Sequence, residues 1–122
     1  MSDHDYTLDD LLDRIVKFRD ERDWKQFHKP KDLALALTIE ISEILEHLRF
    51  KSDGEIEEYL GDGEHRQEVG SELADALYFL LLLSHEAGVD LAAAFEKKME
   101  VIARKYPVHL AKGSNKKYTD LG

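Results

Sequence analysis

The chain has 122 residues and a mass of 14.1 kDa, about the size of one domain with one hydrophobic core. Hydrophobic residues make up 43% and charged residues 35%, which excludes disordered, collagen-like and low-complexity proteins. The absence of cysteine excludes disulfides and thiol nucleophiles, and a net charge of −9 disfavours a nucleic acid polymer as a partner.

Apolar residues recur at helical spacing from the N-terminus onward. Thr7 and Asp10 predict a capping box that opens a first helix, which extends to about residue 22. Residues 24–30 indicate a connection, because Pro30 cannot continue a preceding helix but fits the first turn of a new one. A second helix is therefore predicted from about residue 31 to residue 50.

The second half of the chain also predicts helices. A glycine-containing stretch with a short helix around residues 56–60 comes next. A third long helix then extends over residues 64–86, and Gly88 is the glycine that terminates it. A fourth begins near Asp90, whose side chain can cap it.

The fourth long helix is expected to end at Tyr106, before a proline. The following tail, residues 107–122, is expected to be irregular. Four long helices with short connections predict an all-α fold, a four-helix bundle formed by a single domain over residues 1–122.

No segment predicts secretion or membrane insertion. Residues 1–13 are acidic and lack the basic and apolar regions of a signal peptide. The most apolar run, residues 73–83, is interrupted by Asp75 and is far shorter than the roughly 20 residues that span a bilayer. We therefore expect a cytoplasmic protein with no membrane partner.

Two acidic pairs on the second and third long helices carry the chemical signal. Glu40 and Glu43 are three residues apart, and so are Glu72 and Asp75, which places each pair on one helix face. Asp75 lies in an otherwise apolar stretch, where a buried carboxylate is costly unless it is paired or metal-bound. If the two helices pack antiparallel, the four carboxylates can converge on one cavity, where their mutual repulsion favours a hard divalent cation such as Mg²⁺ or Mn²⁺.

These carboxylates have two other interpretations. Each pair alone is more commonly a solvated helix face, and Glu46 points to the other side of its helix as an example of such a residue. A di-iron bundle would need Glu-x-x-His motifs, and no histidine in the sequence has a glutamate three residues before it.

Aromatic and basic residues indicate a nucleotide rather than a bare metal. Residues 18–28 cluster aromatic and hydrogen-bonding side chains, as a base pocket would, although by spacing alone a core aromatic beside a solvated charged turn is the more common explanation. Basic side chains gather between residues 97 and 117, as a phosphate clamp or as a solvated helix face. They are Lys97, Lys98, Arg104, Lys105, Lys112, Lys116 and Lys117.

The sequence resembles the MazG-like all-α nucleoside triphosphate pyrophosphatase superfamily, in its dCTP pyrophosphatase branch. The likeness rests on the two acidic pairs in order, on residues 18–30 (FRDERDWKQFHKP) and on residues 105–121 (KYPVHLAKGSNKKYTDL). It implies Mg²⁺-dependent hydrolysis of dCTP, and of modified dCTP analogues, to the monophosphate and pyrophosphate, which cleanses the nucleotide pool. It also implies a homo-oligomer, a dimer or a tetramer.

The resemblance also assigns residues. Glu40, Glu43, Glu72 and Asp75 would be the catalytic metal ligands. The substrate would be bound by Trp24, Lys25, Gln26, Phe27, His28, Phe50 and Phe79. The sequence does not choose whether Glu40 or Glu43 orients the attacking water.

Three positions depart from the family pattern and leave the base preference open. Phe50 stands where relatives have tryptophan, Phe79 where they have tyrosine, and Ile15 where some have a histidine. The same reaction on dUTP or another non-standard nucleotide, and a helical interaction module without catalysis, are the alternatives.

Overall fold

The computed structural model describes residues 5–121 and contains helices but no strand among them, so the predicted all-α class is confirmed. The chain divides into two compact units, Met1–Val89 and Asp90–Gly122. The assignment of residues 1–122 to a single domain stays a prediction.

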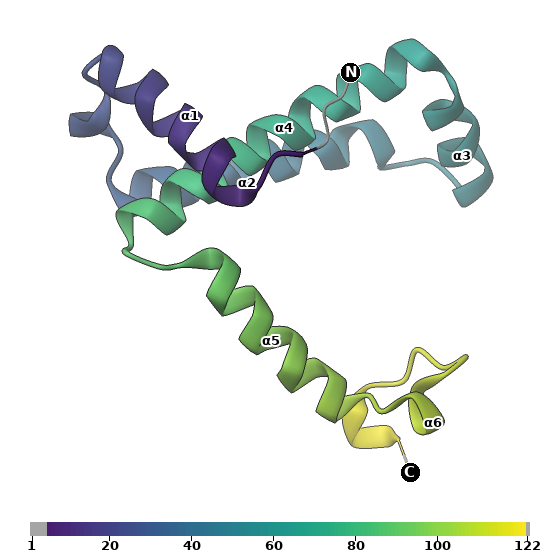
Figure 1. The fold of residues 1–122 in the computed structure, drawn as a ribbon. Coiled ribbons are helices and arrows are strands. Elements are labelled where there is room, and N and C mark those ends of the chain that lie inside the picture. Colours follow the sequence, from purple (N-terminus) through teal and green to yellow (C-terminus); the bar gives the residue numbers. More distant parts are fainter. Residues whose placement is uncertain (1–4, 122) are drawn as a thin grey trace. The chain divides into compact units, whose positions relative to one another are not determined.

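Residues 5–89, the described part of the first unit, form four α-helices, of which α2 and α4 share the most extensive contact. They lie side by side and antiparallel, with α3 connecting them at one end and α1 packing against α4 (Figure 1). A short 3₁₀ helix, η1, lies between α1 and α2. The bounds are α1 Leu8–Glu21, η1 Lys25–Phe27, α2 Pro30–Leu48, α3 Asp53–Gly61 and α4 Gly63–Glu86.

The predicted capping signals are present at the starts of the helices. The Thr7 hydroxyl accepts from the Asp10 amide at 3.0 Å while the Asp10 carboxylate accepts from the Thr7 amide, and Pro30 is the first residue of α2. The predicted short helix is longer than expected, because Ser52 and Glu55 form a second capping box ahead of it.

Two helices of this unit end with the same backbone arrangement. After α4, Gly88 has a φ of +70°, and the amides of Val89 and Gly88 donate back to the carbonyls of Ser84 and His85. After α1, Asp23 takes the corresponding place with a φ of +55°, which costs a residue with a β-carbon more than it costs glycine. The chain therefore turns sharply ahead of the aromatic segment that follows Asp23.

The apolar core of the first unit is small. Leu33 of α2 and Val69, Leu81 and Leu82 of α4 are its buried apolar side chains among the described residues. The remaining faces of α2 and α4 expose many large apolar side chains, including Leu35, Ile39, Ile41, Leu45, Leu73, Leu77 and Leu80.

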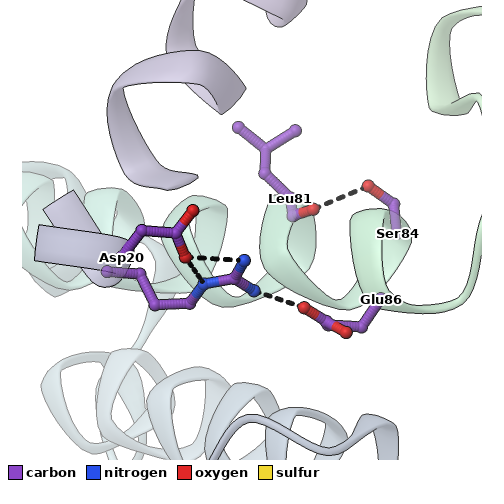
Figure 2. A network of polar contacts seen from close by, with 5 residues as sticks. Asp20, Leu81, Ser84 and Glu86 are labelled. Carbon is purple, nitrogen blue, oxygen red and sulfur yellow. Dashed lines mark hydrogen bonds and ion pairs between the residues drawn. The ribbon is translucent and has the colours of Figure 1, made fainter. Parts of the chain in front are cut away.

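A buried arginine joins α1 to the end of α4. Arg19 is 1% exposed, and its guanidinium pairs with Asp20 at 3.1 Å and with Glu86. Figure 2 shows Asp20 and Glu86 on either side of this guanidinium, with the Ser84 hydroxyl donating to the Leu81 carbonyl nearby. Because a buried charge is costly without partners, this ion pair fixes where α1 meets α4.

The second unit comprises α5 (Leu91–Lys105), α6 (Val108–Ala111) and the 3₁₀ helix η2 (Tyr118–Asp120). The Asp90 side chain caps α5 as predicted, by accepting from the Ala93 amide. The tail after residue 106, expected to be irregular, contains α6 and η2. It is folded back locally, since the Tyr118 amide donates to the Tyr106 hydroxyl.

No single helix within residues 5–121 is long and apolar enough to cross a membrane. Only α4 and α5 taken together reach that length and composition.

Candidate active site

The antiparallel packing of α2 and α4 couples the two predicted acidic pairs electrostatically. Burial, followed by the negative charges of Glu43, Asp75 and Glu72, raises the pKa of the Glu40 carboxyl above its usual value. The structure therefore places charges from both helices near one carboxyl group, as the spacing predicted.

Buried carboxylate oxygens accompany this coupling. Oε2 of Glu40 is inaccessible to solvent and has no hydrogen-bond partner, whereas Oε2 of Glu72 is buried with His47 Nε2 2.7 Å away, in a direction that is not that of a regular hydrogen bond. A buried, unpartnered oxygen such as that of Glu40 is unstable as an anion unless a cation or a proton joins it.

The expected burial of Asp75 is wrong. Asp75 is exposed, and so are its helix neighbours Leu73 and Leu77, because the helices packed on α4 in the first unit leave this side of it open. The apolar run over residues 73–83 is not buried all round. Asp75 is accessible to a solute in this unit instead of being enclosed in its core.

The four carboxylates fit a hard divalent cation by chemistry, because they offer oxygen donors that repel one another and include a buried, unpartnered oxygen on Glu40. Within residues 5–121, no three His, Cys, Asp or Glu side chains stand close enough together to hold a metal ion. The ligand assignment to Glu40, Glu43, Glu72 and Asp75 stays a prediction.

A cavity of about 210 Å³ lies beside these carboxylates. It is lined by Glu43, Glu46, His47, Tyr59 and Glu72, which come from α2, α3 and α4. Glu46 was expected to point to the far side of α2. It is exposed and pairs with Arg49 at 3.2 Å, but it also borders this cavity.

The aromatic segment after α1 is ordered by ring contacts. The ring of Trp24 lies edge-on to Phe18 at a centroid distance of 5.7 Å and to His28 at 6.5 Å. Lys25 and Phe27 are exposed, and the Gln26 amide donates to the Asp23 carbonyl at 3.0 Å.

His28 is the most enclosed of the predicted substrate-binding residues in this segment. Its Nδ1 is buried without a partner, and burial followed by the positive charge of Arg19 lowers its pKa, against a smaller opposite effect of Glu86. A neutral ring with an unpartnered nitrogen can read a hydrogen-bonding group on a ligand.

An open apolar groove of about 390 Å³ lies between α1 and α4. Phe18 and Tyr78 contribute aromatic rings to it, and Ile15 lies in its wall. Tyr78 follows Asp75 by three residues, so the groove borders the acidic face of α4. The other lining residues are Leu11, Arg14, Ala74 and Leu77.

The two remaining predicted aromatics lie in different surroundings. Phe50 is 91% exposed with a φ of +63°, an unusual backbone region for a bulky residue, and its ring lies beneath the Arg49 guanidinium at 4.8 Å. Phe79 is half-buried against Tyr78. Among the described ring pairs, neither contacts Trp24, so the structure does not bring Trp24, Phe50 and Phe79 together.

The basic tail belongs to the second unit. Within it, the Lys105 ammonium lies 4.6 Å from the ring centre of Tyr118. The role of Arg104, Lys105, Lys112, Lys116 and Lys117 toward phosphate stays a prediction.

Sequence reasoning missed two groups. Arg19 follows Ile15 and Leu12 by four and seven residues and so continues the buried stripe of α1, a pattern that could have identified it. The contact of His47 with Tyr59 and Glu72 depends on how α3 folds back, which helix periodicity does not describe.

Taken together, these features define an all-α protein whose two antiparallel central helices present an acidic face beside an apolar groove. The MazG-like family model matches residues 35–121, and the chain belongs to this family. Both acidic pairs and the tail motif lie inside the matched region, as does most of the second predicted helix.

Similar proteins agree with this assignment. The chain is 41% identical to human dCTP pyrophosphatase 1 and 42% identical to the rat protein, in each case over 94% of this chain and 68% of the relative. The crystal structure of a pyrophosphatase from Archaeoglobus fulgidus superposes with a TM-score of 0.76 at 38% identity, covering 88% of this chain and 98% of that one.

Proposed function

We propose that the protein is a nucleoside triphosphate pyrophosphatase that hydrolyses dCTP to dCMP and pyrophosphate with Mg²⁺. The observation that carries the proposal is the antiparallel packing of α2 on α4, which brings the charges of Glu72 and Asp75 close enough to act on Glu40. The curated relatives named dCTP pyrophosphatase 1, at 41–42% identity over 94% of the chain, support this substrate class.

The four carboxylates of the two pairs are the proposed ligands of the cation. Bound there, Mg²⁺, or Mn²⁺ in its place, would neutralise phosphate charge and supply an activated water. The half-buried Glu40 and Glu72 anchor the site to the helix contact, while the exposed Glu43 and Asp75 face the substrate. Members of the family are generally dependent on a divalent metal.

The base is proposed to bind on the aromatic side of the site. Phe18 lines the apolar groove, and the ring of Trp24 lies edge-on to that of Phe18. Tyr78, three residues after Asp75, lines the same groove. His28 offers a buried, unpartnered nitrogen to a polar edge of the nucleotide. Phe50, exposed and held at positive φ, is available to stack on a ligand, with Phe79 behind Tyr78.

A panel of deoxynucleotides tests the substrate. We expect kcat/KM for dCTP and 5-methyl-dCTP to exceed that for dTTP, dATP and dGTP, because relatives of this identity carry the dCTP name. Glu58→Gln, which changes an exposed carboxylate on α3 outside the site, is the matched control and should retain wild-type turnover. A preference for dUTP would support the proposed reaction but show that the proposed base specificity is wrong. If the protein hydrolyses none of these nucleotides, the proposal that it is an enzyme is wrong.

We further propose that the working form is a homo-oligomer. The first unit has few buried apolar side chains and exposes Leu35, Ile39 and Leu45 on α2 together with Leu73 and Leu80 on α4. A second copy that covers these side chains would remove them from water. The resemblance to dimeric and tetrameric family members supports this assembly. The cytoplasm, where deoxynucleotides are used, is the proposed compartment.

A further inference from the structure

His47 lies between a proposed metal ligand and an anchor on a different helix. Its Nε2 is 2.7 Å from Oε2 of Glu72, and its Nδ1 is 2.6 Å from the Tyr59 hydroxyl. The side chains of His47 and Glu72 are only 16% and 22% exposed. The contact with Glu72 has the distance of an ion pair, although its direction is not that of a regular hydrogen bond.

The donor and acceptor roles follow from the partners. An ionised carboxylate only accepts, so the His47 nitrogen facing Glu72 is the one that carries a proton. In the neutral ring the other nitrogen then accepts from the Tyr59 hydroxyl. Burial and the charges of Glu68, Glu72 and Asp62 raise the pKa of Tyr59, which keeps that hydroxyl protonated.

Tyr59 is itself held in place. Its ring stacks on His65 of α4 at a centroid distance of 4.0 Å and an interplanar angle of 7°, and the Lys51 ammonium lies 4.6 Å from its ring centre. The hydroxyl is therefore a fixed point on α3 against which His47 is oriented.

We propose that His47, anchored by Tyr59, is a positioning residue that orients the Glu72 carboxylate for the cation. The inference rests on the proposed function, because it needs Glu72 to be a ligand. Groups behind a metal ligand fix its orientation, and their loss commonly weakens metal binding by about 10–100-fold. The two contacts, from Tyr59 to His47 and from His47 to Glu72, link α3, α2 and α4. Helix α3 therefore supports the acidic face as well as connecting two helices.

The test is Mn²⁺ binding without nucleotide, measured by electron paramagnetic resonance, for wild type, His47→Leu, His47→Gln and Tyr59→Phe. We expect His47→Leu to raise the Mn²⁺ Kd about tenfold. His47→Gln, whose amide can still donate to Glu72, should retain most of the wild-type affinity for Mn²⁺. The Mn²⁺ Kd of Tyr59→Phe should lie between those of His47→Gln and His47→Leu. The Mg²⁺ concentration for half-maximal turnover should rise in the same order, with KM for dCTP at saturating Mg²⁺ unchanged.

His85→Gln, an exposed histidine near the other end of α4, is the matched control and should leave Mn²⁺ affinity unchanged. An Mn²⁺ Kd within twofold of wild type in His47→Leu would overturn the inference while leaving the proposed function in place. If His47→Leu fails to fold, an unchanged Kd in the milder Tyr59→Phe overturns it equally. A wild-type protein that binds no Mn²⁺ would contradict the proposed metal site and this inference with it.

Discussion

Asp75 remains a proposed ligand, although the argument from burial that singled it out is wrong. The sequence places it in an apolar stretch, which predicts burial, but α4 has an open side in the first unit and the carboxylate is exposed. The argument from the three-residue separation of Glu72 and Asp75 does not depend on burial. The two residues share one face of α4, and both raise the pKa of Glu40 across the helix contact.

Asp75→Asn is expected to remove a proposed ligand without harming the fold. Turnover of dCTP should fall by more than about a hundredfold, since changes to residues behind a ligand already cost 10–100-fold. The melting temperature without metal should stay the same or rise slightly, because one of the charges repelling Glu40 is removed. Steady-state kinetics and circular dichroism check both outcomes, and full activity would mean that Asp75 is not a ligand.

His28 predicts a dependence of stability on pH. Its folded-state pKa lies below the unfolded value of about 6.5, because burial and Arg19 disfavour the charged ring. The contribution of neutral His28 to the stability of the folded state is therefore fully present at pH values above the unfolded pKa. It is lost as the pH falls through the folded pKa.

Urea unfolding of wild type and His28→Gln at several values between pH 7.5 and pH 5 measures this effect. The wild type should lose more unfolding free energy than the variant as the pH decreases. Equal losses in the two proteins would show that His28 does not have a lowered pKa.

The helices themselves were largely predictable, because their signals are local. The capping box of Thr7, the proline that opens α2 and the aspartate that caps α5 act within one turn and appear directly in the sequence. The buried guanidinium of Arg19 was not predicted, since its partner Glu86 is 67 residues away and only the packing of α1 on α4 brings them together.

The pairing of Arg19 with Glu86 should make the loss of either side chain alone costly at that helix contact. Arg19→Leu is expected to cost about 3–5 kcal/mol of unfolding free energy, because it leaves the Glu86 carboxylate unpaired in a half-buried place. The double variant Arg19→Leu/Glu86→Leu should recover most of that loss. Denaturant titrations of both variants check the coupling, and additive losses would indicate that the two side chains do not interact.

At the scale of the whole molecule, the sequence predicted helix content and the two acidic faces but not how much apolar surface stays exposed. Ile41 follows Leu37 by four residues, a spacing that predicts a shared buried face of α2, yet Ile41 is exposed, as is Ile39 at 57%. Periodicity reports which residues share a face, whereas burial depends on what packs against that face. The cavity beside Glu72 was missed for the same reason, because it needs α3 to return toward α2 and α4.

Ile39→Glu tests the proposed assembly. A charge placed among exposed apolar side chains of α2 should dissociate the oligomer, because its burial in an interface would be unfavourable. Light scattering after size-exclusion chromatography should give a multiple of 14.1 kDa for wild type and a smaller mass for the variant. A wild-type protein that is monomeric at all concentrations would contradict the proposal.

The central claim is that carboxylates from α2 and α4 form one metal-dependent site for a nucleoside triphosphate. Phosphorus NMR of dCTP incubated with the protein, with Mg²⁺ and again with excess EDTA, tests it most directly. We predict the appearance of dCMP and pyrophosphate with Mg²⁺ and no reaction with EDTA. Release of orthophosphate, or turnover that continues in EDTA, would contradict the account.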